Sequence, residues 1–168
     1  MDTLIVAVAQ YAIFLVALGA VAVWVVVDRP VKIPLAVQAV LTVLIVAGLV
    51  KLASTLHTDP RPFVVDPSLK PMFAHPPDNG FPSDHTALAA GVAFLVIAYR
   101  RWVGVGLLAI AVGIGLARVA AHVHHLQDIG AGLLIGLVAA TVVLLAWHLT
   151  IGRIGHERHA DETPAGRS

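Results

Sequence analysis

Long apolar runs alternate with short polar segments along the whole chain. Five runs lack charged residues in their interiors, and they cover Thr3–Val27, Ile33–Val50, Ser83–Tyr99, Val103–Ala117 and Ile129–Gly152. A transmembrane helix needs about 20 mainly apolar residues, with a range of roughly 17 to 25. The pattern therefore predicts an all-α protein, built as a polytopic bundle of about five transmembrane helices.

The polar segments between these runs predict how the helices connect. Asp28–Lys32 and Arg100–Trp102 are short enough to form tight turns, whereas residues 57–82 form a long loop that is rich in Pro and Asp. We expect a single transmembrane domain over residues 1–152. A polar tail follows over residues 153–168, and we expect disorder at its end.

The composition agrees with a membrane protein, because 58% of the residues are hydrophobic and 12% are charged, against about 25% charged in soluble domains. The formal net charge is +1 and the basic residues are scattered, so nothing indicates a nucleic-acid partner. The absence of cysteine excludes disulfides and thiolate metal sites. The first apolar run follows an acidic residue and is too long for a signal peptide, so we expect a retained helix.

The basic residues predict the orientation of the bundle. With five spans, the two short turns and the tail share one face, which carries seven of the eleven Lys and Arg residues. Positive residues favour the cytoplasmic side, and the three Trp residues lie near the same helix ends, as in an interfacial belt. We therefore expect a cytoplasmic tail, with the N-terminus, the 57–82 loop and the 118–128 segment on the outer face.

Three polar stretches meet on that outer face, namely Lys51–Phe63, Gly80–Ala87 and Ala117–Gly130. Ionisable groups at membrane depth are costly and indicate function. In the last stretch, His124 and Asp128 are four residues apart and would share one helix face, so that the carboxylate holds Nδ1–H and Nε2 keeps its lone pair. This arrangement suits a nucleophile or general base. Arg118 lies six residues before His124, so we expect a helix break near residues 122–124.

The other two stretches add an acid and an anion site. Ser83 is a candidate N-cap of the third span, where the free N–H groups of a helix start attract anions. His85 follows in the first turn and is placed to donate a proton. Arg61 stands between two prolines and offers a planar fork that suits phosphate. Together these residues predict a phosphate site that includes an acid, a base and a nucleophile.

A metal site is an alternative use of the histidines. His122, His124 and His125 are close enough in sequence for a His-only site, which would fit a metal-binding membrane protein or a transporter. Against it, the first, third and fifth spans have no charged residue at their centres. No group of carboxylates accompanies the histidines, as a magnesium phosphatase needs. We therefore expect no metal and no other cofactor.

The polar stretches resemble the three signatures of the type 2 phosphatidic acid phosphatase superfamily. The matching residues are Arg61-Pro62, Pro82–His85 and Arg118-x5-His124-x3-Asp128, with Asp84 and Ala117 where the family usually has Gly and Ser. A narrower resemblance, carried by "DPRPFV" and "HPPDNGFPSDHTA", is to the bacitracin-resistance branch of bacterial undecaprenyl-diphosphate phosphatases. The resemblance covers most of residues 11–152.

This resemblance implies a hydrolase of the bacterial cell membrane that converts undecaprenyl, or another polyprenyl, diphosphate to the monophosphate and so recycles the cell-wall lipid carrier. In the implied mechanism His124 attacks phosphorus to form a phosphohistidine, Asp128 orients His124, and His85 protonates the leaving oxygen. Arg61 and Arg118 hold the phosphate, helped by the N–H groups near Ser83 and Asp84. The active site would face the periplasm, and no metal is required.

Some assignments stay open. The family has a lysine seven residues before Arg61, where this chain has Ser54, and Lys51 one helical turn earlier is the candidate to replace it. The same residues would also serve phosphatidylglycerol phosphate, phosphatidic acid or a decaprenyl-linked phosphoribose phosphate, and the oligomeric state is not indicated. We expect His75→Ala and His125→Ala to cost much less activity than substitution of the nucleophile.

Overall fold

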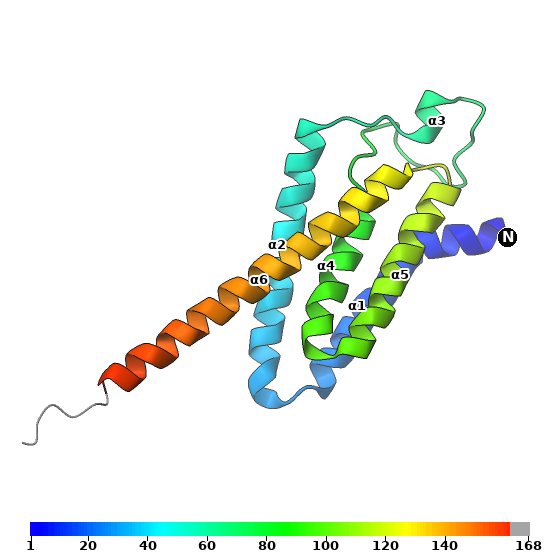
Figure 1. The fold of residues 1–168 in the computed structure, drawn as a ribbon. Helices are drawn as coiled ribbons and strands as arrows, with labels where there is room; N and C mark the ends of the chain where they lie inside the picture. The colour runs from blue at the N-terminus through cyan, green and yellow to red at the C-terminus, as the bar shows by residue number, and fades with distance from the viewer. Residues whose placement is uncertain (162–168) are drawn as a thin grey trace, which may run out of the picture.

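The computed structural model describes residues 1–161. Six helices occur in this part, namely α1 (Asp2–Val26), α2 (Arg29–Leu56), α3 (Pro62–Val65), α4 (Asp84–Tyr99), α5 (Arg101–Ala120) and α6 (Leu126–Asp161). Residues 1–161 contain no β-strand, and Pro60 and Asn79 form an isolated bridge. The predicted all-α fold is confirmed (Figure 1).

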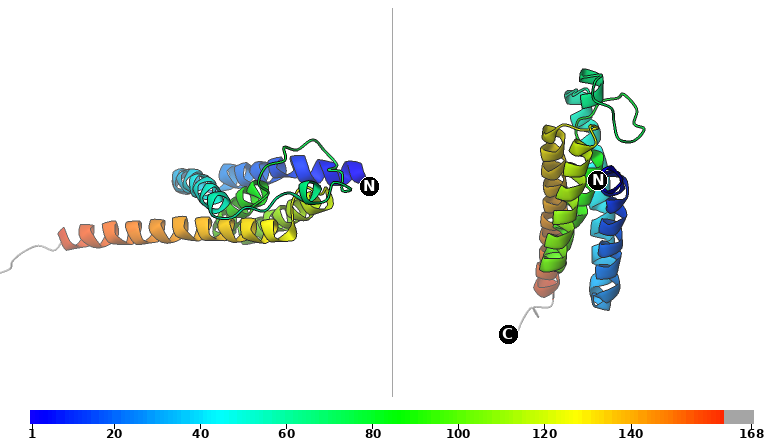
Figure 2. Two further views of the ribbon diagram at one scale, coloured as in Figure 1. Left: turned by 90° about the horizontal axis from the view of Figure 1, so that it is seen from above. Right: turned by 90° about the vertical axis from the view of Figure 1, so that its right-hand side faces the viewer.

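The helices account for the predicted spans. α1, α2, α5 and α6 are each long and apolar enough to cross a membrane. α4 has 16 residues, which is about 24 Å at 1.5 Å per residue and shorter than a hydrocarbon core of roughly 30 Å. It packs against the other four long helices, between α1 and α2 on one side and α5 and α6 on the other (Figure 2). Protein rather than lipid therefore covers this shorter helix, and the chain is a multi-pass membrane protein.

The connections differ from the predicted boundaries. α2 begins at Arg29, so the turn before it is shorter than Asp28–Lys32, because Pro30 fits the first turn of a helix, where its missing N–H is not needed. Arg100 alone separates α4 from α5. α6 continues past Gly152, so part of the predicted tail is helical. The disorder expected at the end of the tail concerns residues 162–168, which lie outside the described residues.

Small residues let α4 and α6 approach closely. A Cβ added to Gly136 of α6 would lie 2.6 Å from the backbone nitrogen of Gly91 and 2.7 Å from the Cβ of Ala90, both on α4. One turn earlier, a Cβ on Gly132 would lie 2.8 Å from the carbonyl oxygen of Ser83. Helices in lipid gain little from burying apolar area, so close van der Waals packing at small residues holds them together. This packing places the first turns of α4 and α6 side by side.

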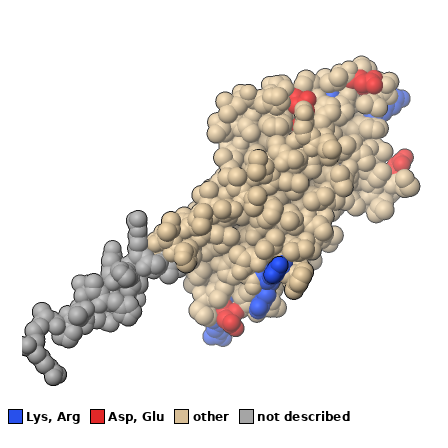
Figure 3. All heavy atoms as spheres, in the orientation of Figure 1, with Lys and Arg blue, Asp and Glu red and all other residues tan. Residues whose placement is uncertain are grey.

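The lateral surface is apolar, and charge lies towards the ends of the bundle. Figure 3 shows Lys, Arg, Asp and Glu near two ends of the molecule, with a broad region between them that carries none on this face. At the end with the tight turns, Lys32 Nζ lies 5.1 Å from the Trp24 ring centroid and the Arg101 guanidinium lies 5.5 Å from that of Trp102. Such aromatic and basic pairs are typical of membrane interfaces.

Candidate active site

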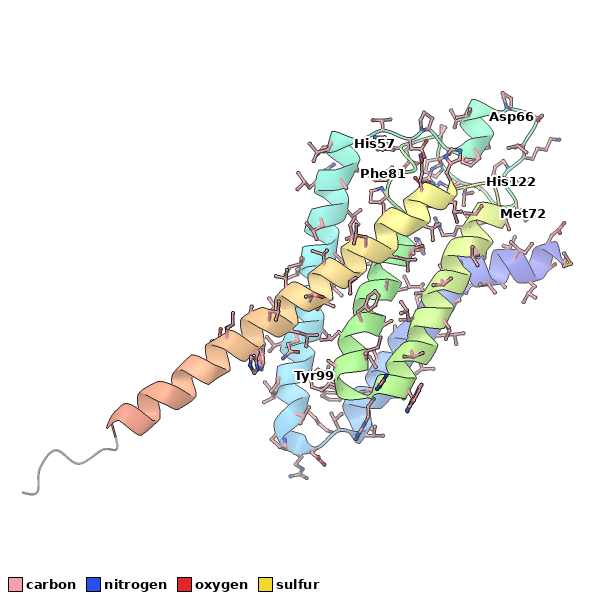
Figure 4. The ribbon with its side chains drawn as sticks, viewed as in Figure 1. His57, Asp66, Met72, Phe81, Tyr99 and His122 are labelled. Atoms are coloured by element: carbon pink, nitrogen blue, oxygen red, sulfur yellow. The ribbon has the colours of Figure 1, made fainter. Side chains whose placement is uncertain are left out.

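The three polar stretches meet at the end of the bundle opposite the tight turns. In Figure 4, His57, Phe81 and His122 lie at this end, whereas Tyr99 lies at the other. A cavity of about 220 Å³ opens here, lined by Val50, Ser54, Arg61, His75, Asp78, Asn79, Phe81, Pro82, Asp84, His85, Arg118 and His124. Larger grooves between α2 and α6 and between α1, α2 and α4 have almost entirely apolar walls and offer no reactive group.

His124 lies buried in the segment between α5 and α6. Its Nδ1 is 3.2 Å from Asp128 Oδ2, and its Nε2 is 3.4 Å from Arg61 Nη1. Because a guanidinium only donates and a carboxylate only accepts, these contacts place the proton of the neutral ring on Nδ1 and leave a lone pair on Nε2. The expected pairing is present, but not on one helix face. His124 precedes α6, and Asp128 reaches back to it from the first turn of α6.

The break between α5 and α6 lies where the sequence predicts it. α5 ends at Ala120, and His122 has a φ of 60°, in the left-handed region. The His122 ring donates from Nδ1 to the Lys70 carbonyl oxygen at 3.1 Å, and the Met72 N–H donates to the Ala121 carbonyl oxygen at 3.2 Å. These two bonds attach the segment between α5 and α6 to the long loop. His122 therefore has a structural role and stabilises the backbone of the site.

Asp128 supports both His124 and the start of α6. Its Oδ2 also accepts the His125 N–H at 2.8 Å, as an acidic side chain in a first helical turn caps a helix. From the loop after α2, Asp59 Oδ2 accepts bonds from His125 Nδ1 at 2.9 Å and Gln127 Nε2 at 2.6 Å. Burial raises the pKa of Asp59, but these hydrogen bonds and the His125 charge outweigh burial, and the pKa lies below its ordinary value. His125 therefore holds α6 and does not line the cavity.

Arg61 is buried although it lies in a loop. Its Nε donates to Asp78 Oδ1 at 2.8 Å, and its Nη1 donates to the Val123 carbonyl oxygen at 2.7 Å. Asn79 braces the same loop, because it accepts the Asp59 N–H at 2.9 Å and donates to two carbonyl oxygens at the end of α2. These bonds hold the guanidinium beside His124 Nε2.

Arg118 is buried in the last turn of α5. Its Nη1 donates to the Ala9 carbonyl oxygen of α1 at 3.2 Å, and its Nη2 donates to His75 Nε2 at 3.3 Å. Its Nε–H is buried and has no partner among the described residues. A buried, unpaired donor on a cation is rare in proteins, and an anion would satisfy it.

His85 and Asp84 lie on the cavity wall at the start of α4. Asp84 Oδ1 accepts both the His85 N–H at 2.8 Å and His85 Nδ1–H at 3.0 Å. This pairing orients the ring and leaves its Nε2 free for proton transfer. Asp84 thus contacts His85 rather than presenting its carboxylate alone to an anion.

Two sequence candidates do not reach the cavity. Ser83 caps α4 by position, but its N–H donates to the Asp128 carbonyl oxygen at 3.1 Å and its hydroxyl bonds the Thr86 hydroxyl at 3.0 Å. Ser83 therefore joins α4 to α6 and does not line the cavity. Lys51 is exposed on α2, and Ser54, one turn later, lines the cavity in its place.

His75 and Asp78 also line the cavity, although neither was a predicted site residue. Both come from the long loop, whose path cannot be read from hydropathy. The available signal was their place in the "HPPDNG" segment, directly before the second signature.

The three histidines proposed for a His-only metal site do not converge. His122 contacts the Lys70 carbonyl oxygen, His124 contacts Asp128, and His125 contacts Asp59. Among the described residues, ligand atoms of Asp59, His125 and Asp128 do lie within 4.8 Å of one another. Asp59 Oδ2 already accepts two hydrogen bonds, one of them from His125 Nδ1, so a metal bound between this oxygen and that nitrogen would have to replace them.

We expect His124 to titrate below its ordinary pKa of 6.5. Burial lowers the pKa most, and the charges of Arg118 and Arg61 lower it further, whereas the Asp128 hydrogen bond raises it. The neutral, nucleophilic ring therefore persists at pH values where an exposed histidine is already protonated. Nuclear magnetic resonance titration of ¹³C-histidine-labelled protein checks this, with His124→Gln identifying the resonance. A midpoint at or above 6.5 would contradict the expectation.

Residues 35–151 match the family model of the PAP2 superfamily. The bacitracin transport permease protein BcrC of Bacillus licheniformis is 34% identical over 136 residues, which span 80% of this chain and 66% of that protein, just under two thirds of its length. Undecaprenyl-diphosphatase BcrC of Bacillus subtilis (strain 168) is 26% identical over 140 residues, which span 82% of this chain and 70% of that protein. The crystal structure of Aquifex aeolicus LpxE shares the fold, with a TM-score of 0.65, 24% identity and coverage of 85% of this chain and 84% of that one.

Proposed function

This chain belongs to the PAP2 superfamily, and from that membership we propose that it is a membrane-embedded phosphatase that hydrolyses undecaprenyl, or another polyprenyl, diphosphate to the monophosphate. One observation carries the proposal. His124, which is paired with the buried Asp128, lines one cavity together with two buried arginines, Arg61 and Arg118, at the end of a transmembrane bundle. The name of the Bacillus subtilis relative supports the choice of lipid.

The two arginines bind the terminal phosphate. Arg118 offers its unpaired Nε–H. Arg61 Nη1 donates to the Val123 carbonyl oxygen at 2.7 Å and also makes a long contact of 3.4 Å to His124 Nε2. An entering phosphate oxygen replaces that long contact with a shorter, charge-assisted bond. Binding of the phosphate therefore releases the lone pair of His124 Nε2 from its contact with Arg61. It also places the phosphorus atom within reach of that lone pair.

The reaction proceeds in two displacements. His124 Nε2 attacks the terminal phosphorus, and the bond from phosphorus to the bridging oxygen breaks. His85 protonates that oxygen, so that the lipid monophosphate leaves. Asp128 stabilises the charge that develops on the His124 ring, and the arginines stabilise the charge on the phosphoryl oxygens. Water, deprotonated by His85, then attacks the phosphohistidine and releases inorganic phosphate.

The position of the cavity fits a lipid substrate. It lies where the polar loop meets the apolar bundle, which is the depth of a lipid head group, and Val50 and Phe81 contribute an apolar part of its wall. The excess of basic residues on the opposite face supports a cytoplasmic position for that face. The site would then open to the periplasmic side of the bacterial cell membrane, where residues 1–152 act as the phosphatase domain.

The test is release of inorganic phosphate from undecaprenyl diphosphate by the full chain, purified in detergent and assayed with EDTA. We expect release by the wild-type protein, and faster release than from phosphatidic acid or phosphatidylglycerol phosphate. If the protein prefers one of the other lipids, the proposed substrate is wrong and the proposed reaction, hydrolysis of a lipid phosphate, stands. Absence of release from every lipid phosphate would overturn the proposal and favour a transport role, in line with the permease name of the Bacillus licheniformis relative.

A further inference from the structure

His75 occupies a place in the cavity that the proposed reaction does not use. It lies on the loop between α3 and α4, and its ring centroid is 6.4 Å from that of His124, with the ring planes at 79°. Its Nε2 is 3.3 Å from Arg118 Nη2, and its Nδ1 is 3.3 Å from the Pro76 carbonyl oxygen. His75 thus brings an imidazole from the loop to the wall of the cavity beside Arg118 and His124.

The two contacts determine the tautomer of His75. A guanidinium nitrogen only donates, so Nε2 must be unprotonated, and a carbonyl oxygen only accepts, so the proton is on Nδ1. Burial lowers the pKa of His75 below its ordinary value, as do the charges of Arg61 and Arg118, against the Pro76 hydrogen bond, which raises it. The ring is therefore neutral and acts as a hydrogen-bond acceptor.

Arg118 depends on this acceptor for its orientation. Its two terminal nitrogens are held by the Ala9 carbonyl oxygen and by His75 Nε2, and its Nε–H has no partner among the described residues. Without His75 a single bond would remain, and the guanidinium would be free to turn toward the Asp84 carboxylate, which lines the same cavity.

We propose that His75 is a positioning residue that, as a neutral acceptor, holds the Arg118 guanidinium in the orientation required for phosphate binding. This inference rests on the proposed function, because that function assigns Arg118 to the phosphate. It agrees with the expectation that His75→Ala costs much less activity than substitution of His124, and it gives His75 a role. It also differs from direct phosphate binding by His75, which would require a protonated Nε2.

Two substitutions of His75, one with and one without a hydrogen-bond acceptor, separate positioning of Arg118 from direct phosphate binding. His75→Ala removes the acceptor, whereas His75→Gln retains one in its amide oxygen but cannot carry charge. We expect His75→Ala to lower kcat/KM about tenfold to a hundredfold, the range for a hydrogen bond to a charged group, and to weaken binding of orthovanadate, a phosphate analogue, by a similar factor. His75→Gln should recover both to within about threefold. His148→Ala, exposed on α6, is the matched control and should change neither.

A second pair of variants tests whether His75 acts through Arg118. Arg118→Lys keeps the positive charge but lacks the planar guanidinium. Adding His75→Ala to Arg118→Lys should cost little activity beyond the loss caused by Arg118→Lys alone. Full additivity, or a His75→Gln protein as impaired as His75→Ala, would overturn the inference. Orthovanadate binding, measured by calorimetry, does not depend on the lipid. If the vanadate pattern holds while no lipid phosphate is hydrolysed, the proposed function fails and the inference stands.

Discussion

Replacing His124 with alanine is expected to abolish phosphate release, with a loss on the order of 10⁴-fold or more, as for other removed nucleophiles. In the structure His124 Nε2 carries a lone pair beside Arg61 Nη1, and Arg118 lines the same cavity. The measurement is the initial rate of phosphate release from undecaprenyl diphosphate. A quench under alkaline conditions, with substrate labelled at the terminal phosphate, should trap labelled protein for the wild type and none for His124→Ala.

His125→Ala is the matched control for this prediction. His125 is the next residue, but its Nδ1 is bonded to Asp59 Oδ2 at 2.9 Å and its ring does not line the cavity. We expect a modest loss of activity through weaker anchoring of α6, and we expect labelling to persist. Equal inactivation by the two substitutions would show that His124 is not the nucleophile.

Asp128→Asn is expected to lower kcat by about 10³-fold to 10⁴-fold, and the corresponding change in a Ser-His-Asp triad costs about 10⁴-fold. Asparagine can still accept the bonds from His124 and His125 through one oxygen, so the start of α6 should survive. It lacks the negative charge that stabilises the His124 ring once phosphorus is bound. Its amide nitrogen would also take the place of Asp128 Oδ1, which is buried without a partner in the described part of the chain. Single-turnover kinetics should place the loss in formation of the phosphohistidine.

Asp59→Asn provides the control for the structural role of Asp128. Asp59 supports the same start of α6 through His125 and Gln127, but it does not contact His124. If anchoring of α6 were the whole function of Asp128, the two substitutions would lower kcat equally. We expect Asp59→Asn to cost far less activity, with both variants retaining wild-type helicity by circular dichroism.

The sequence alone determined the bundle. The thickness of the hydrocarbon core sets the length of each apolar run, and backbone groups in lipid must be paired within a helix, so hydropathy identifies the spans. Hydropathy did not determine the helix ends, because these depend on local features. Pro30 starts α2 earlier than the hydropathy pattern indicates, and α6 continues to Asp161. The His124–Asp128 pairing was also predictable, since four residues separate the two, even though His124 lies outside the helix.

Only the tertiary structure decided which distant groups meet. The contact of Arg61 with Val123, that of Arg118 with His75, and that of Asp59 with His125 join residues from separate loops and helix ends. Ser83, at the N-cap of α4, was a predicted phosphate ligand, yet its N–H donates to the Asp128 carbonyl oxygen of α6. A side chain's hydrogen-bond partners are set by helix packing and loop path, which depend on small-residue contacts such as Gly91 with Gly136. Residue type therefore indicated the chemistry of the site, and packing determined which side chains are free to perform it.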